Sequence, residues 1–126
     1  MVRWREKLFI VNLKRWVQTT RGGSIYLMKI SLSNEAIEWF KEEMGLTNGD
    51  YLKFFAKIYG SSPVQESYAL GFAKEDPIDM SASTEVDGII FFVEVTDEWF
   101  FNGHDLHAHY NKEKDELEFS YTKPNN

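Results

Sequence analysis

The amino-acid sequence predicts one α+β domain, built from an N-terminal helix and a largely antiparallel set of β-hairpins. Three observations lead to this class. A well-capped amphipathic helix begins the acidic part of the chain, several short alternating segments follow it, and turns rich in Asn, Asp and Gly separate those segments. The length of 126 residues suits one domain and is short for two.

The composition is that of a globular protein with an aromatic core. Hydrophobic residues make up 43% and charged residues 27%, while Phe, Tyr and Trp together reach 16%. Large aromatic side chains bury much apolar surface per residue, which helps so small a domain. The absence of cysteine excludes a disulfide scaffold, a Cys-type zinc site, thiol catalysis and a thiolate-held iron–sulfur cluster.

The apolar run at residues 8–11 ends at Asn12 and is far too short to cross a membrane. We therefore expect no membrane span and a cytoplasmic location.

Charge divides the chain near Met28. Residues 1–27 hold six basic side chains and one acid, a net charge of +5, and the remainder carries a net charge of −11. One folded surface rarely separates charge so cleanly along the sequence. We predict a basic extension or tail at residues 1–28, a domain at 29–121 and a C-terminal tail at 122–126.

Three interpretations of the basic segment remain open. It could be a solvated tail or amphipathic arm. It could be a non-native extension, since Met28 resembles a start and Arg21-Gly22-Gly23 can be encoded by a purine-rich, ribosome-binding-like stretch. It could also be an arm for nucleic acid or an anionic membrane, with Trp4 and Trp16 as stacking or interface residues. We do not expect nucleic acid as a partner, because the acidic body would repel it.

The helix is predicted from its end signals. Ser33 suits the N-cap, Glu35 lies in the first turn where negative charge is favoured, and Gly45 suits the left-handed residue that ends a helix. One apolar stripe lies between these ends, at Ile37, Phe40 and Met44.

Alternation of apolar and polar residues predicts the strands. Gly60 begins a turn at residues 60–63, residues 74–83 read as a polar connection, and Asp87-Gly88 is a strong hairpin signal. Thr96 to Glu98 can cap a short helical turn. The expected strands are 51–59, 67–73, 84–86 paired with 89–93, and 105–110 paired with 116–121.

Five short segments resemble the HesB/IscA-like iron–sulfur cluster biosynthesis family, and most closely its YneR-like branch from Gram-positive bacteria. They are Ile-Ser-Leu-Ser-Asn-Glu-Ala at 30–36, Tyr-Gly-Ser-Ser at 59–62, Leu-Gly-Phe at 70–72, Asp-Gly-Ile with Phe-Phe-Val at 87–93, and Phe-Asn-Gly-His-Asp-Leu at 101–106. The resemblance covers residues 29–121 and implies a HesB-like domain.

The resemblance also implies where cluster ligands would lie. Members that carry clusters use one cysteine after a Gly-Gly turn and a Cys-Gly-Cys near the C-terminus. Ser61 occupies the first position here, and the C-terminal pair has no counterpart. A serine hydroxyl stays protonated at neutral pH and is a poor iron ligand. We therefore expect a non-enzymatic accessory or binding protein associated with iron–sulfur biogenesis, without a cofactor, iron or a cluster.

Two alternatives remain. The chain could be a cytosolic module for protein interaction or homodimerisation that is unrelated to cluster assembly. It could instead bind a metal through His104, His107, His109 and Asp105, since imidazoles and carboxylates together can hold a divalent ion. We favour the outer, solvated face of a hairpin for these residues and expect no metal. We also expect no catalytic residues, because no nucleophile elbow or phosphate loop is present.

Trp99, Phe100 and Phe101 are consecutive, so a single helical turn cannot point all three into one core. At least one is expected to face outward or into a partner, and the three form a candidate interaction surface. The alternative is burial between the sheet and the helix. A protein partner or self-association is expected.

Overall fold

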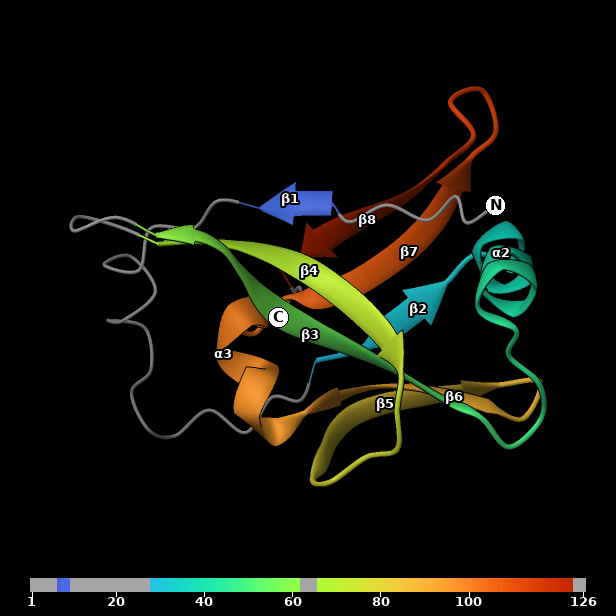
Figure 1. The fold of residues 1–126 in the computed structure, drawn as a ribbon, viewed down its shortest axis with the longest axis horizontal. Coiled ribbons are helices and arrows are strands. Elements are labelled where there is room, and N and C mark those ends of the chain that lie inside the picture. Colours follow the sequence, from blue (N-terminus) through green and yellow to red (C-terminus); the bar gives the residue numbers. More distant parts are fainter. Residues whose placement is uncertain (1–6, 10–27, 62–65, 124–126) are drawn as a thin grey trace.

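The computed structural model describes residues 7–9, 28–61 and 66–123 and confirms the α+β class. Figure 1 shows how the helices and strands are arranged in space. The elements are β1 (Lys7–Phe9), β2 (Ile30–Leu32), α2 (Asn34–Met44), β3 (Tyr51–Ser61), β4 (Glu66–Lys74), β5 (Met80–Val86), β6 (Ile89–Glu94), the 3₁₀ turn η1 (Val95–Asp97), α3 (Glu98–Phe101), β7 (Asp105–Asn111) and β8 (Glu116–Thr122).

Helix α2 has the ends that the sequence predicts. The Ser33 hydroxyl accepts a hydrogen bond from the Ala36 amide at 3.1 Å, which satisfies one of the unpaired donors of the first turn. Gly45 ends the helix in the left-handed conformation, with φ at 65°. Ile37 and Phe40 are buried, so the predicted stripe faces the core.

The larger sheet has five strands in the order β1-β4-β3-β6-β5. Neighbouring strands are antiparallel except β3 and β6, which run parallel from the Tyr51–Ile90 pair to the Phe54–Val93 pair. The Asp87-Gly88 turn joins β5 to β6, and both residues have positive φ, as its hairpin requires. The sheet is therefore mixed: the β3–β4 and β5–β6 hairpins are joined by the parallel pairing of β3 with β6.

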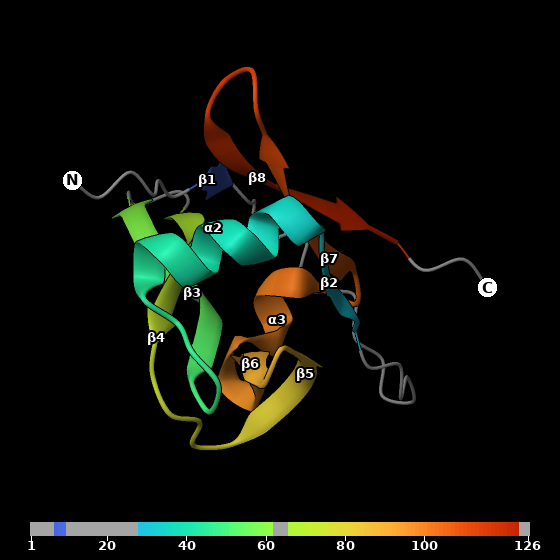
Figure 2. The same cartoon turned by 90° about the vertical axis from the view of Figure 1, so that its right-hand side faces the viewer.

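The smaller sheet has the order β2-β7-β8. Strand β2 runs parallel to β7, and β7 and β8 form the predicted C-terminal hairpin. Figure 2 shows α2 in front of the sheets, with β3 and β4 to one side and β7 and β8 to the other.

The core lies where the two sheets and α2 meet, and aromatic rings fill it. Phe40 on α2 packs within 5.9 Å, between ring centroids, of Phe54, Phe72 and Phe91. Phe119 on β8 reaches Phe54 at 5.9 Å and so joins the smaller sheet to the larger one. The aromatic surplus of the sequence is thus mostly core.

Two expected boundaries were wrong. Strand β3 continues through Gly60 to Ser61, with a shift in register after Ile58, because β4 pairs with it to the end. The polar connection after β4 is shorter than expected, since β5 already begins at Met80. The structure also shows that Lys7–Phe9, within the basic segment, pairs with β4 as strand β1, which the sequence did not predict.

The basic residues and tryptophans of that extension outside β1, Trp4 and Trp16 among them, lie outside the described residues. The boundary predicted near Met28 stays a prediction. Within the described ranges, no helix is long and apolar enough to cross a membrane.

Candidate interaction surface

Helix α3 separates the three consecutive aromatic residues. Phe100 and Phe101 are buried, and both rings pack near Tyr121 on β8, at 6.3 and 6.1 Å between centroids. Trp99 is 41% exposed. One turn of helix therefore places two rings in the core and leaves the third at the surface.

Trp99 extends an apolar surface across several elements. Its ring lies 4.9 Å from that of Tyr68, and Tyr68 pairs across the β3–β4 ladder with Ile58, which is 62% exposed. Two further links bring the start of β5 beside α3: the Val95 amide donates to the Asp79 carbonyl at 2.9 Å, and the Ser81 hydroxyl donates to the Glu98 carboxylate. We call the exposed apolar residues here the Trp99 surface: Ile58, Ile78, Met80, Val95 and Trp99.

A buried carboxylate organises one part of this surface. Glu94 at the end of β6 is only 5% exposed, and its two carboxylate oxygens accept the backbone amides of Ile78 and Asp79 at 2.8 and 2.7 Å. Hydrogen bonds from backbone amides to a carboxylate are among the stronger kinds in proteins. Glu94 thereby fixes the loop that precedes β5.

A second carboxylate, that of Asp97, accepts a backbone hydrogen bond from β3 just after the end of β6. Asp97 in η1 accepts the Ala56 amide at 3.4 Å, beyond the point where β6 stops pairing with β3. Burial of Asp97 raises the pKa of its carboxyl; the Ala56 hydrogen bond and Lys53 oppose the shift, and Glu94 adds to it. Four of the five residues of the Trp99 surface lie in a segment without Lys or Arg, from 75 to 111, while the exposed Lys57 adjoins the fifth, Ile58.

Two of the predicted metal candidates, His107 and His109, lie on the outer face of the smaller sheet. His107 Nδ1 and Ser31 Oγ share a hydrogen bond of 2.8 Å, and His109 Nε2 donates to Glu118 at 3.1 Å. The two imidazole rings stack at 5.6 Å. Burial would raise the pKa of Glu118, but the hydrogen bonds from His109 and Asn111 outweigh it and lower that pKa.

The other two candidates point elsewhere. His104 Nδ1 donates to the carbonyls of Phe101 and Asn102, both at 3.1 Å, and Asp105 accepts the Lys29 amide at 2.9 Å. Within the part of the chain that the structure describes, no three His, Cys, Asp or Glu side chains are grouped to hold a metal ion. These hydrogen bonds join the four side chains to different partners rather than to one shared centre.

Ser61, where the resemblance would place the first cluster ligand, is the last residue of β3 and pairs with Glu66 of β4. Its side chain lies outside the described residues, as do residues 62–65.

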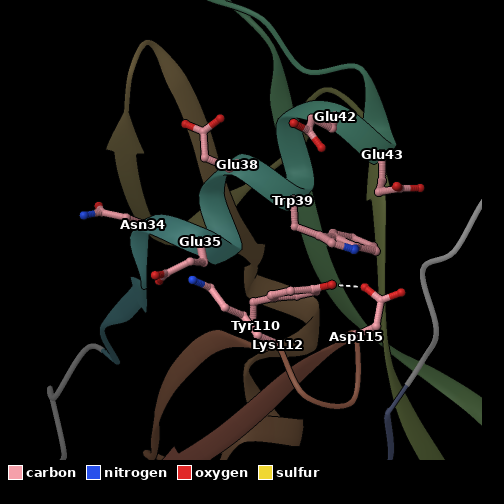
Figure 3. A pocket seen from close by; sticks show the side chains of 9 residues that line it. All are labelled: Asn34, Glu35, Glu38, Trp39, Glu42, Glu43, Tyr110, Lys112 and Asp115. Carbon is pink, nitrogen blue, oxygen red and sulfur yellow. Dashed lines mark hydrogen bonds between the residues drawn. The ribbon is translucent and has the colours of Figure 1, made fainter.

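A groove of about 440 Å³ lies between α2 and the β7–β8 turn, on another part of the molecule (Figure 3). Trp39 and Tyr110 form aromatic walls, and the Tyr110 hydroxyl donates to Asp115. The carboxylates around it disfavour an anionic ligand. They belong to Glu35, Glu38, Glu42, Glu43 and Asp115, and Lys112 lies among them.

Sequence reasoning named Trp99 as one of three candidates but missed Ile78 and Glu94. Ile78 lay inside the expected polar connection, and Glu94 just beyond an expected strand. An isolated apolar residue after Asp76-Pro77 was the available signal, but the partner of Glu94 depends on a contact 16 residues away.

No protein-family model matches the chain. It is 40% identical over 94 residues, 75% of this chain and 99% of the relative, to a Bacillus subtilis protein named pyruvate dehydrogenase inhibitor. An uncharacterised protein of Staphylococcus saprophyticus is 31% identical over 74% of this chain and 98% of its own. One from Staphylococcus aureus is 29% identical over 76% of this chain and 99% of its own. The chain therefore belongs to the family that contains the Bacillus subtilis protein named pyruvate dehydrogenase inhibitor.

Proposed function

We propose that this chain is a non-enzymatic cytoplasmic protein that binds a pyruvate dehydrogenase and lowers its activity. The observation that carries the proposal is the Trp99 surface, in which a half-exposed Trp packs on Tyr68 and exposed apolar residues lie on the neighbouring segments of β3, β5 and η1. Tryptophan in such a setting is a frequent energetic centre of protein interfaces. The name of the Bacillus subtilis relative supplies the partner and the direction of the effect.

Binding through this surface would reduce the rate without any chemistry by the chain itself. An inhibitor of this kind needs only a surface that binds the enzyme and either covers a site or holds an unproductive arrangement. The Trp99 surface would serve this purpose. The acidic groove beside α2 would repel a small anionic substrate such as pyruvate, so it supports no competing role as a pyruvate site.

The test is a rate measurement with purified components. The pyruvate dehydrogenase complex of Bacillus subtilis is assayed by NADH formation from pyruvate, coenzyme A and NAD⁺, with increasing amounts of the full chain. We expect a saturable fall in rate, together with co-sedimentation of the chain and the complex. An unchanged rate at a large molar excess, with no co-sedimentation, would overturn the proposal.

A matched variant shows whether inhibition depends on the proposed surface. Trp99→Ala should weaken inhibition, and Glu113→Ala, on the exposed β7–β8 turn, should leave it unchanged. Equal loss in both variants would point to a general effect on folding rather than to this surface.

The accessory role in iron–sulfur biogenesis is a second proposal. Its support is the resemblance over residues 29–121, together with the α+β fold. Anaerobic incubation with iron and sulfide tests whether the chain itself holds a cluster. We expect no stable cluster, and a bound cluster would contradict the accessory role. Co-purification with a cluster-assembly scaffold would favour this role over inhibition of pyruvate dehydrogenase.

A further inference from the structure

Ile78 is 92% exposed although it lies in a tightly held loop. Its backbone amide and that of Asp79 both bond to the buried Glu94 carboxylate, and the Asp79 carbonyl accepts the Val95 amide. Pro77, directly before Ile78, further limits the backbone. The loop therefore has a defined conformation that displays this side chain.

That arrangement has a free-energy cost. A buried carboxylate must be desolvated, and a fully exposed Ile forgoes the burial that would stabilise the fold. A mobile loop could turn Ile78 back onto the protein, but three backbone hydrogen bonds oppose this. Side chains fixed in a binding-competent position lose less entropy on association, which favours a recognition role.

The charge around Ile78 indicates what kind of surface can face it. Asp76, Asp79 and Glu98 are exposed acids near the loop, and the sequence has no Lys or Arg from 75 to 111. A second copy of the chain would bring like charges together at this surface. A partner with basic residues around an apolar pocket is complementary to it.

We propose that Ile78 is an anchor residue, held outward by Glu94, that enters an apolar pocket bordered by Lys or Arg on the partner enzyme. The inference rests on the proposed function for the identity of that enzyme. Met80 lies two residues after the anchor, Val95 bonds through its amide to Asp79, and both side chains are exposed and apolar.

The experiment compares four variants for binding to the Bacillus subtilis pyruvate dehydrogenase complex, at low and high salt. Ile78→Asp removes the anchor, Ile78→Leu keeps it apolar, and Ser83→Asp adds the same charge at an exposed position further along β5. Glu94→Gln keeps the side-chain shape but weakens the hold on the loop, and hydrogen exchange at the Ile78 and Asp79 amides should become faster in it.

We expect Ile78→Asp to weaken binding by about tenfold or more, the loss that exclusion of one buried Ile predicts. Ile78→Leu and Ser83→Asp should bind like the wild type, and added salt should weaken binding by the wild type. Unchanged binding by Ile78→Asp overturns the anchor and leaves the proposed function standing. An equal loss in Ser83→Asp overturns it as well, because the effect then belongs to added charge alone.

A crosslinking arm separates failure of the anchor from failure of the function. Chains with a photo-crosslinking phenylalanine analogue at position 78 or 83 are expressed in Bacillus subtilis, and the adducts are mapped by mass spectrometry. An adduct from position 78 alone, on an apolar peptide flanked by Lys or Arg in some other protein, retains the anchor and rejects pyruvate dehydrogenase. An adduct with a second copy of the chain, or none from position 78, overturns the anchor.

Discussion

The Trp99 and Tyr68 rings meet edge to face, with centroids 4.9 Å apart and ring planes at 76°. This contact connects the short helix α3 to β4, although the two elements lie about thirty residues apart in the sequence. Tyr68 is buried while Trp99 keeps 41% of its surface exposed. The pair thus forms the border between the core and the Trp99 surface.

The first prediction compares the same substitution at two tryptophans. Trp99→Ala should reduce inhibition of pyruvate dehydrogenase at least about tenfold, as loss of an interface Trp usually does, and should cost about 1 kcal/mol of stability through the lost Tyr68 contact. Trp39→Ala should do the reverse. Its ring packs on Phe40 and Phe72 at 5.3 and 6.0 Å, so stability falls while inhibition persists below the melting temperature. Inhibition curves and urea unfolding measure the two effects, and equal inhibition by both variants would contradict the assignment of the surface.

A second prediction concerns the contact between two turns. The Gly49 amide donates to the Gly88 carbonyl at 2.8 Å, and a Cβ at Gly88 would lie only 1.8 Å from Asn48 Oδ1. Gly88 also has φ at +78°, which side chains disfavour. Gly88→Ala should therefore cost about 2–4 kcal/mol.

The double variant Asn48→Ala with Gly88→Ala should recover part of that loss, because it removes the collision but keeps the backbone strain. A double-mutant cycle in urea gives the coupling. Strictly additive losses would show that strain alone accounts for the effect.

The third prediction is that the effect of Gly71→Ala on stability changes sign when Phe55 is replaced. A Cβ there would approach Phe55 Cζ to 2.7 Å, since the Phe55 ring covers Gly71 from the neighbouring strand, with Lys53 Nζ 5.4 Å from the ring centroid. Gly71→Ala should cost about 1–3 kcal/mol by overpacking in the wild type. In a Phe55→Ala background it should be neutral or stabilise by up to about 1 kcal/mol, because Ala suits a strand better than Gly. Thermal unfolding of the four proteins tests this, and the same destabilisation in both backgrounds would refute it.

Local signals were enough for the elements that short stretches of sequence determine. The caps of α2 and the Asp87-Gly88 hairpin depend on backbone preferences over a few residues, and both were predicted correctly. The same holds for the alternation that placed His107 and His109 on the outer face of their hairpin.

Pairings between distant segments could not be obtained in that way. The parallel neighbours β3 and β6, and β2 and β7, have no local signature, because each depends on the whole chain between them. Glu94 shows the consequence for the candidate site: its sequence position suggests a solvated strand end, and only the approach of the Ile78 loop makes it a buried acceptor. For Trp99, Phe100 and Phe101, the sequence predicted that at least one ring faces outward, but it did not indicate which one.

The last prediction is a pH dependence at Asp97. Burial raises the pKa of this carboxyl above its ordinary value of 3.8, despite the Ala56 hydrogen bond, so the folded protein binds a proton there more tightly than the unfolded chain. Between pH 3.8 and the raised folded pKa the folded state carries the extra proton. Stability therefore decreases through this group as pH rises across that window, and the loss is complete above the folded pKa.

Asp97→Asn should remove the charge and keep an oxygen that can accept the Ala56 amide. The variant should therefore gain stability relative to the wild type at neutral pH, and the gain should shrink as pH falls through the folded pKa of Asp97. Urea unfolding of both proteins between pH 3.5 and 7.5 measures the difference directly, so that groups such as Glu118, whose lowered pKa makes stability fall in acid, contribute equally to both curves. A difference that is constant with pH, or a variant less stable at pH 7.5 than at pH 4 relative to wild type, would show that the Asp97 charge is not disfavoured in the fold.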